Sequence, residues 1–224
     1  MPAQPIVAPS WRRACVVAIV AAAVLVAVVG VAVYDVKTTT AFDTWAARPL
    51  FDHIGERGRV VLLALTAPVI TVGALAVIAT VGALMRSWEV VALAIVGPTV
   101  AEVVTEFVLK PIVHRQITDG PSGYAYPSGH ETGLVSLLVV LLLLLPRAQL
   151  SRSMTGLLDA LLVLWAVLGA IGLVRGHFHF MTDTIGGIGV AVACVLGLAV
   201  LIDLGAPRLR RTDPAGSGQF TRRS

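Results

Sequence analysis

The sequence contains few charged residues. Charged side chains make up 13% of its 224 residues, hydrophobic residues make up 57%, and the mean hydropathy is +0.87. A water-soluble domain of this length needs far more charge to cover its surface, so this scarcity excludes an ordinary soluble protein. A soluble protein with a very large core is excluded too, because several uninterrupted apolar stretches reach the roughly 20 residues that span a bilayer.

The sequence also contains only two cysteines, Cys15 and Cys194, and both fall within apolar segments. This number and placement exclude a disulfide framework, and the spacing offers no metal site. The net charge is +4 and the pI is about 9.6. Because the basic residues cluster beside apolar segments, they suit membrane topology and anionic lipids better than nucleic acid, and we expect no nucleic-acid partner.

Six apolar segments predict six membrane-spanning helices. The first follows Arg12 and Arg13 as a secretory signal would, but the run from Ala14 to Val33 is long for a signal core and has no clear cleavage site. We therefore interpret it as a retained helix. Both ends of the chain are rich in Pro, Gly, Ser or Arg and are predicted to be disordered over 1–13 and 206–224, which leaves one membrane domain at 14–205. The predicted helices cover about 14–34, 60–85, 90–109, 130–146, 156–176 and 184–204.

Basic residues predict the orientation of these helices. With six helices both termini lie on one side, and that side collects ten of the 17 Lys and Arg residues. Its loops hold almost no acidic residues, whereas the first loop on the opposite side balances its bases with acids. The positive-inside rule therefore places both termini in the cytoplasm, with the protein in the inner membrane. Loops 110–130 and 175–183 then lie at the extracytoplasmic boundary.

The first outer loop carries a group of large apolar residues. They fit either a helix that lies in the membrane interface or a plain loop anchored by aromatic side chains. These residues are Phe42, Trp45, Leu50 and Phe51.

Charged residues recur at the end of the third predicted helix. Glu102, Glu106 and Lys110 are spaced one helical turn apart, and Arg115 follows. An unpaired carboxylate inside a membrane segment costs on the order of 3 kcal/mol, which favours a Glu106–Lys110 pair that faces a polar interior. The alternative is that Lys110 and Arg115 only anchor the helix end among lipid headgroups.

The stretch "PSGHETG" precedes the charge-free run of the fourth helix. Ser128, Gly129 and His130 are predicted to form its first turn, where free backbone N–H groups create an anion site. Gly129 allows an anion close to the backbone, the Ser128 hydroxyl adds a donor, and His130 can give a proton near neutral pH. Ordinary capping beside an idle histidine explains each residue separately, but not the glycine.

The stretch "RGHFHFMTD" places Arg175, His179 and Asp183 four residues apart, on one face if the segment is helical. A hydrogen bond from His179 to Asp183 would fix the histidine tautomer and leave the other ring nitrogen as a nucleophile. The pair also fits half of a metal site, but His114 and His177 do not complete a convincing ligand set. In the predicted topology these stretches meet at the outer face as a cationic pocket suited to phosphate chemistry.

These motifs resemble those of the type 2 phosphatidic acid phosphatase (PAP2) superfamily of integral membrane lipid phosphatases. "PSGH" at 127–130 fits the second family motif without change, and "HFMTD" at 179–183 fits the end of the third. The resemblance covers roughly residues 90–200. It implies an all-α bundle of six transmembrane helices, with an active site at the extracytoplasmic membrane interface that needs no metal or other cofactor.

The resemblance also implies a role for each motif residue. His179 is similar to the family nucleophile that becomes a phosphohistidine, Asp183 to the carboxylate that orients it, and His130 to the general acid. The positions that resemble the family's phosphate-binding residues are Lys110, Ser128 and Gly129.

The chain departs from the family pattern at two arginines. Ile117 and Thr118 stand where the first motif ends in Arg-Pro, so Arg115 is expected to bind phosphate alone. Leu173 stands where the third motif has arginine, so Arg175 is expected to enter the pocket from a shifted position. These changes suggest a divergent branch or a weakened activity.

The sequence therefore predicts an enzyme that hydrolyses a lipid phosphate or pyrophosphate in the membrane. Polyprenyl pyrophosphate, phosphatidic acid and phosphatidylglycerol phosphate are the candidate substrates, and membrane lipids are the expected partners. A phosphotransferase of the same fold and a catalytically weak lipid-binding relative are the alternatives. A transporter that uses Glu102 and Glu106 as relays is disfavoured, because the polar residues gather at one face rather than at mid-membrane.

Overall fold

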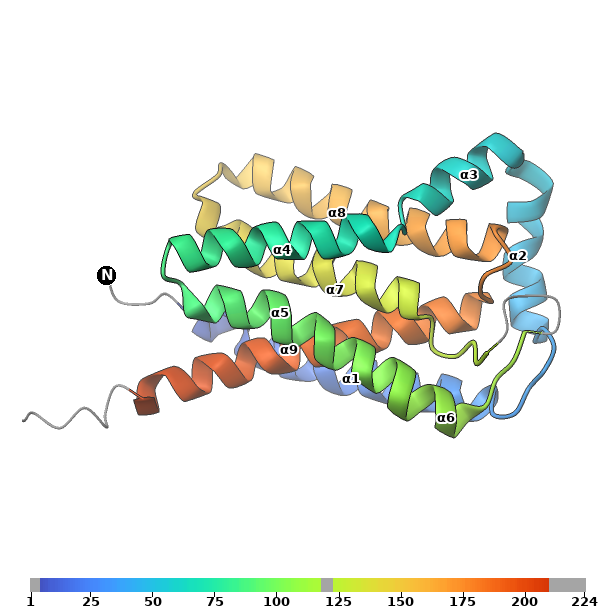
Figure 1. Cartoon of the computed structure of the whole chain (residues 1–224), viewed down its shortest axis with the longest axis horizontal. Helices are drawn as coiled ribbons and strands as arrows, with labels where there is room; N and C mark the ends of the chain where they lie inside the picture. The colour runs from blue at the N-terminus through green and yellow to red at the C-terminus, as the bar shows by residue number, and fades with distance from the viewer. Residues whose placement is uncertain (1–4, 118–122, 210–224) are drawn as a thin grey trace, which may run out of the picture.

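The structure is a computed structural model that describes residues 5–117 and 123–209 (Figure 1). Thr118 lies outside the described residues, as do the two extreme ends of the chain. The described residues form helices and no named strand. The main elements are α1 (Arg12–Ala32), α2 (Ala41–His53), α3 (Glu56–Ala64), α4 (Pro68–Leu84), α5 (Trp88–Val103), the π-helical segment η2 (Val104–Leu109), α6 (Lys110–Val113), α7 (Gly129–Leu144), α8 (Arg152–Arg175) and α9 (Met181–Leu209).

Six helical stretches are long and apolar enough to cross a membrane, and each overlaps one predicted segment. The prediction of an all-α, six-helix transmembrane bundle is therefore confirmed. The third span is longer than predicted, because η2 and α6 continue α5 as far as Val113. The spans are Pro9–Ala32, Glu56–Leu84, Trp88–Val113, Gly129–Ala148, Arg152–Arg175 and Met181–Gly205.

The outer surface of the bundle is apolar. Val31, Leu84 and Phe107 are each more than three-quarters exposed (79%, 80% and 77%) and lie on three different spans. Large apolar side chains exposed over a continuous surface mark contact with a membrane or a partner. The long apolar helices and this surface support an integral membrane protein.

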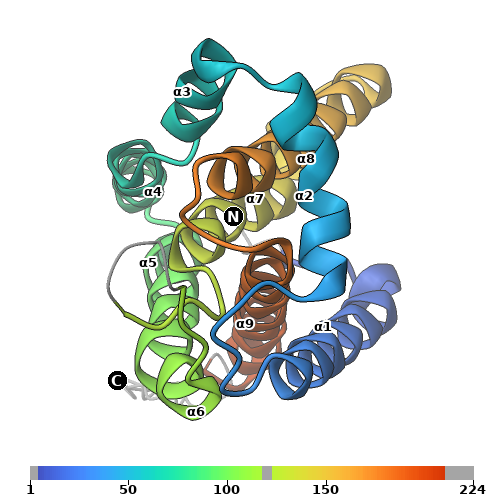
Figure 2. The ribbon, with the colours of Figure 1, turned by 90° about the vertical axis from the view of Figure 1, so that its right-hand side faces the viewer.

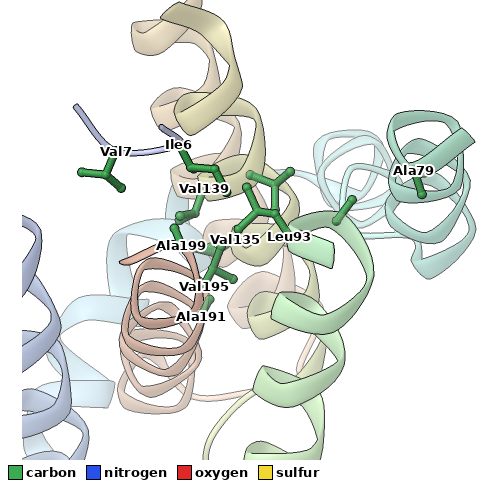
Figure 3. Close-up of a cluster of buried hydrophobic side chains, with 11 residues drawn as sticks. Ile6, Val7, Ala79, Leu93, Val135, Val139, Ala191, Val195 and Ala199 are labelled. Atoms are coloured by element: carbon green, nitrogen blue, oxygen red, sulfur yellow. The ribbon is translucent and has the colours of Figure 1, made fainter. Parts of the chain in front are cut away.

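The buried apolar core lies toward the end of the bundle that carries the chain termini (Figure 3). α9 is central in this arrangement and packs against α1, α5 and α7 (Figure 2). Leu93 of α5, Val140 of α7 and Val195 of α9 are fully buried in one cluster. Close packing of branched aliphatic side chains holds the long helices together at this end.

The segment before α1 is ordered where the structure describes it. Ile6 and Val7 are buried, and their backbone N–H groups donate to the two carboxylate oxygens of Asp203 on α9, each at 2.8 Å. The prediction of disorder for residues 1–13 therefore does not hold for this segment. The sequence pattern missed it because the carboxylate that fixes the segment lies almost two hundred residues away in the chain.

α2 crosses the opposite end of the bundle (Figures 1 and 2). Thr40 and Asp43 form a capping box that begins this helix: the Thr40 hydroxyl accepts the Asp43 N–H, and the Asp43 carboxylate accepts the Thr40 N–H, each at 3.1 Å. Trp45 is largely exposed beside Phe42, with ring centroids 5.9 Å apart. Of the two interpretations of this loop, the structure supports the helix with outward aromatic residues.

The same end of the bundle brings together the starts of α7 and α9 and the end of α8. Tyr126 is fully buried just before α7 and donates its hydroxyl to the carbonyl of Val26 on α1 at 2.6 Å. The backbone N–H of Ser128 donates to the carbonyl of Asp183 on α9 at 3.0 Å. These contacts fix where the first turns of α7 and α9 lie relative to each other.

Candidate active site

The predicted phosphate cradle is the first turn of α7. Ser128 is its N-cap, and the Ser128 hydroxyl accepts the backbone N–H of Glu131 at 3.3 Å. This side chain is fully buried and does not line the adjacent cavity, whereas Gly129 and His130 do. Ser128 therefore shapes the helix start, and the residues that follow it present the helix N-terminus to the cavity.

Two glycines of α7 face two carboxylates of the third span. A Cβ atom at Gly129 would lie 2.5 Å from Oε1 of Glu106, and one at Gly133 would lie 2.9 Å from Oε1 of Glu102. The absence of a side chain at these two positions of α7 therefore makes room for both carboxylates, and this explains why a glycine stands in the first turn. Among the described residues no cluster of three or more His, Cys, Asp or Glu could hold a metal ion.

One cavity of about 490 Å³ joins the main predicted residues, and we call it the catalytic cavity. The rings of His130 and His179 both line it, with their centroids 6.3 Å apart, and Lys110 lines it as well. Two histidines at this separation can reach opposite sides of one phosphate group. The rest of the lining comes from Thr66, Pro68, Thr71, Val72, Glu102, Glu106, Ile117, Gly123, Tyr124, Ala125, Gly129, Gly133 and Phe178.

Lys110 and Glu106 form the ion pair that their spacing predicts. The Lys110 ammonium lies 2.6 Å from Oε1 of Glu106, and its side chain is mostly buried. The alternative in which Lys110 only anchors the helix among headgroups is not supported, because its ammonium turns into the catalytic cavity. An ammonium has three N–H donors, so it can hold Glu106 and a phosphate oxygen at the same time.

His179 and Asp183 are adjacent but do not form a hydrogen bond. Nδ1 of His179 lies 3.7 Å from Oδ2 of Asp183, about an ångström beyond a normal hydrogen bond. The same oxygen accepts the backbone N–H of Phe180 at 2.9 Å. Nδ1 is buried and has no hydrogen-bond partner among the described residues, so Asp183 is the nearest group that can orient this ring.

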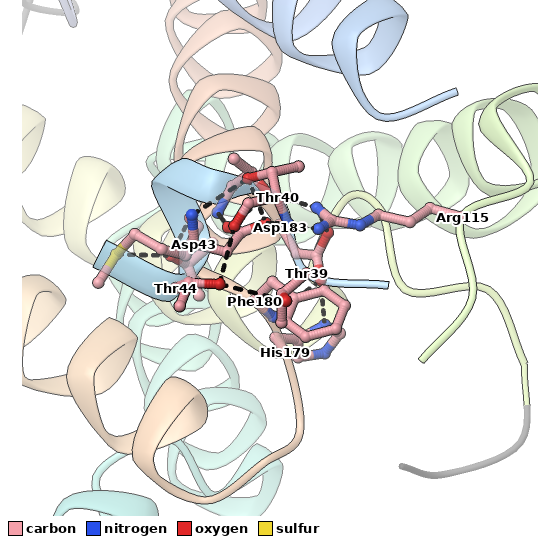
Figure 4. A network of polar contacts seen from close by, with 11 residues as sticks. Thr39, Thr40, Asp43, Thr44, Arg115, His179, Phe180 and Asp183 are labelled. Carbon is pink, nitrogen blue, oxygen red and sulfur yellow. Dashed lines mark hydrogen bonds and ion pairs between the residues drawn. The ribbon is translucent and has the colours of Figure 1, made fainter. Parts of the chain in front are cut away.

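Arg115 contacts Asp183 and does not line the catalytic cavity (Figure 4). Its guanidinium is fully buried and donates to Oδ1 of Asp183 at 2.8 Å, to Oδ2 of Asp43 at 2.6 Å, and to the hydroxyl of Thr182. It also stacks over the Phe180 ring, 4.5 Å from the centroid. The structure thus corrects the expected direct contact of Arg115 with phosphate, because both terminal nitrogens of the guanidinium already donate to carboxylates.

Asp43 is the second anchor of this network and comes from α2. Its Oδ1 accepts both the backbone N–H and the hydroxyl of Thr182 at 2.9 Å. Burial alone would raise the pKa of Asp43, but the Thr182 N–H and the Arg115 guanidinium together hold that pKa below its usual value. The ionised carboxylate therefore fixes Arg115, and Arg115 in turn fixes Asp183.

Arg175 also lies outside the lining of the catalytic cavity. Its Nε donates to the backbone carbonyl of Ile54 at 2.8 Å, and its guanidinium stacks over Phe51, 5.2 Å from the ring centroid. The expectation that Arg175 enters the pocket from a shifted position is therefore not met in this structure. This arginine instead joins the end of α8 to the connection between α2 and α3.

Sequence reasoning missed the part that α2 plays in the site. Asp43 is one of the acids that balance the bases of the first outer loop, and the "TAFD" pattern at 40–43 is a capping-box signal that could have placed it in a first helical turn. Thr182 carried no signal of its own. Its role depends on Asp43, which lies 139 residues away along the chain.

Comparison with known proteins gives the family of the chain. The model of the PAP2 superfamily matches residues 61–204, which is more than half of the chain and includes both histidine motifs. The chain belongs to the PAP2 superfamily. No curated protein matches the sequence significantly.

Among solved structures, the PAP2 chain is similar to a transmembrane PAP2-type phosphatidylglycerolphosphate phosphatase from Bacillus subtilis. The TM-score is 0.68 and the sequence identity is 18%, with 83% of this chain and 96% of that chain covered. At this identity the likeness shows a shared fold. PAP2 membership and the fold together support lipid phosphate hydrolysis in general by a membrane protein.

Proposed function

We propose that this PAP2 protein hydrolyses a lipid phosphate or diphosphate through a covalent phosphohistidine at His179. The observation that carries the proposal is that His179, His130 and Lys110 line one cavity, with the two rings 6.3 Å apart. The chemistry needs a nucleophile, a proton donor and a cation around one phosphate, and these three residues supply them.

In the first step Lys110 and the free N–H groups at the start of α7 hold the phosphate oxygens. Because Nδ1 of His179 faces Asp183, Nε2 is the nitrogen that attacks phosphorus. The P–N bond forms as the bond from phosphorus to the lipid oxygen breaks. The leaving oxygen takes a proton from His130, and positive charge that develops on His179 is stabilised by the nearby Asp183 carboxylate.

In the second step water attacks the phosphohistidine. The neutral His130 removes a proton from the water, a P–O bond forms, and the P–N bond breaks. Inorganic phosphate is released, and both histidines return to their starting protonation states. Arg115 takes no direct part in this scheme and acts as a positioning residue for Asp183.

The lipid part of the substrate is proposed to enter between α4 and the third span. Pro68, Thr71 and Val72 at the start of α4 line the catalytic cavity, and Val72 is also exposed on the outer surface. An apolar chain can therefore pass from the bilayer into the cavity. Lipid phosphomonoesters and polyprenyl diphosphates both fit this arrangement, and the Bacillus subtilis neighbour favours phosphatidylglycerol phosphate among the phosphomonoesters.

We place the termini in the cytoplasm and the catalytic cavity on the outer side. The excess of Lys and Arg on the terminal side, ten against seven when the two ends of the chain are counted, supports this orientation. A membrane-impermeant thiol reagent tests it in intact cells: Thr38→Cys beside α2 should be labelled, whereas Ser151→Cys between α7 and α8 should be labelled only after the cells are opened.

The decisive experiment is phosphate release by the purified protein in detergent with a chelator present. The substrates are a polyprenyl diphosphate, a short-chain phosphatidic acid and a short-chain phosphatidylglycerol phosphate. His179→Ala should lower release by at least about a thousandfold, because the nucleophile is removed, and His130→Ala by about a hundredfold or more. His53→Ala is the matched control, since His53 is exposed on α2 and does not line the catalytic cavity.

Acid quench of labelled substrate should trap an acid-labile phosphoprotein in the wild type and not in His179→Ala. Equal release by wild type and His179→Ala would refute the proposed nucleophile. No release from any of the lipids, by protein that elutes as a single folded species, would instead support the catalytically weak relative.

A further inference from the structure

A second cavity of about 750 Å³ lies beneath α2, and we call it the α2 cleft. Arg48 of α2 and Lys37 just before it line this cleft, together with the hydroxyls of Thr38, Thr39 and Thr44. Arg48 is exposed, and none of the described residues forms an ion pair with it. Nothing in the proposed reaction so far uses these cationic and hydroxyl groups.

The α2 cleft and the catalytic cavity share a wall. His179 and Ile117 line both spaces, whereas His130 and Lys110 line only the catalytic cavity. His179 and Thr39 of this cleft are both labelled in Figure 4. A phosphoryl group carried on His179 therefore stands at the boundary between the two spaces.

Cations line both spaces. In the catalytic cavity Lys110 is already paired with Glu106 and holds the substrate phosphate in the proposed reaction. In the α2 cleft Arg48 forms no ion pair with any described residue, and the lining carboxylate Asp43 is already paired with the buried Arg115, which leaves Asp52 as the other lining carboxylate. Arg48 can therefore attract a phosphate dianion once it is released from the histidine.

We propose that the α2 cleft binds the inorganic phosphate released from His179, with Arg48 as the cation that holds it. This inference rests on the proposed function. Hydrolysis of a lipid phosphomonoester yields two products of opposite character, an apolar lipid alcohol and a doubly charged phosphate. The alcohol returns to the bilayer beside α4, and the phosphate leaves through the cleft on the other side of the histidine.

The reaction supplies this ligand without any further reagent. When water attacks the phosphohistidine, its oxygen joins phosphorus, the P–N bond breaks, and His130 receives the proton. The phosphate that forms is no longer attached to the lipid, so only electrostatic contacts and hydrogen bonds hold it. The hydroxyls of Thr38 and Thr39 and the guanidinium of Arg48 are suited to that task, whereas the Thr44 hydroxyl already donates to the Thr40 carbonyl.

Product inhibition tests the proposal. Inorganic phosphate is added to the phosphatidic acid assay, and its inhibition constant is measured for wild type, Arg48→Gln, Arg48→Lys, Asp52→Asn and Arg57→Gln. Arg48→Gln should raise the constant by about tenfold, because a charged contact is lost, and Arg48→Lys by less. Asp52→Asn should lower it by about threefold. Arg57→Gln is the matched control, since Arg57 is an exposed arginine of the neighbouring α3 that lines neither cavity.

In Arg48→Gln the inhibition constant for phosphate should rise by a larger factor than KM for the lipid. An unchanged constant in Arg48→Gln would overturn the proposal, and so would an equal rise in both quantities, which would place Arg48 at the lipid phosphate itself. Calorimetric binding of inorganic phosphate to the same proteins provides a readout without turnover. The two proposals fail on different results. If the wild type releases no phosphate from any lipid, the proposed function fails. If wild type and Arg48→Gln bind inorganic phosphate with equal affinity, the phosphate site in the α2 cleft fails.

Discussion

At one end of the bundle Leu93, Val140 and Val195 pack in an apolar cluster, and at the other end Arg115 is held between Asp43 and Asp183. Both regions are fully buried, yet they tolerate change differently. Apolar packing has little directionality and depends mainly on volume. The arginine network has fixed donor and acceptor directions, and it sets where Asp183 stands beside His179. Apolar packing thus stabilises one end of the bundle, and the arginine network positions the residues of the proposed site at the other end.

The largest expected effect is in the network. Arg115→Met leaves Asp43 and Asp183 buried without a cation, which should lower the free energy of unfolding by about 3–5 kcal/mol. The fall in melting temperature in detergent measures it. The double variant Arg115→Met/Asp43→Asn should cost less than the sum of its single changes, because the second change removes one stranded charge. Strict additivity would show that the two side chains are not coupled.

The apolar end should respond with stability alone. Leu93→Ala removes a fully buried side chain from the core and should cost about 3 kcal/mol, whereas Leu93→Met should cost under about 1.5 kcal/mol. Lipid phosphate turnover per folded molecule should stay at the wild-type value in both variants. A loss of turnover per folded molecule in Leu93→Ala would contradict this distinction between the two ends.

Two helical glycines sharpen the comparison. Gly129→Ala places a Cβ atom 2.5 Å from Glu106, so this carboxylate must move away from Lys110, and kcat/KM should fall by about tenfold. Gly197→Ala is the matched change in α9, where a Cβ atom meets nothing within 4 Å, and it should gain up to about 1 kcal/mol of stability without changing activity. Equal kinetics for the two variants would contradict the role of Gly129.

The smallest effect is expected where the N-terminal segment joins α9. Asp203→Asn replaces one of two carboxylate oxygens that accept the N–H groups of Ile6 and Val7, which should cost about 1 kcal/mol. Limited proteolysis should then cut this segment faster, while lipid turnover stays the same. An unchanged cleavage rate would show that apolar burial of the two residues is sufficient to hold the segment.

Local patterns in the sequence were enough to predict the six spans and the two histidine motifs. A run of apolar residues must be a helix in a bilayer, since only internal hydrogen bonds satisfy its backbone there. "PSGH" and "HFMTD" are each short enough that spacing alone keeps their residues together, and the structure places them at or just before the first turns of α7 and α9. Lys110 was predictable as well, because its partner Glu106 lies one turn away on the same helix.

The arginines could not be assigned from spacing. Arg115 lies five residues after Lys110 in the chain, yet its side chain turns away from the cavity toward Asp43, which is 72 residues distant. Arg175 lies four residues before His179, yet it bonds a carbonyl beyond α2. In both cases a partner on α2 or just after it decided the direction of a long side chain.

The sequence by itself determined the membrane class of this protein, its helix number and its PAP2 membership, because these depend on local hydropathy and on contiguous motifs. Only the tertiary structure decided that Arg115 bonds Asp183 outside the catalytic cavity and that His179 lines two cavities. The physical reason is that charge pairing acts through space. Residues from α2, from the segment after α6 and from α9 become partners only after helix packing brings those distant segments to one end of the bundle.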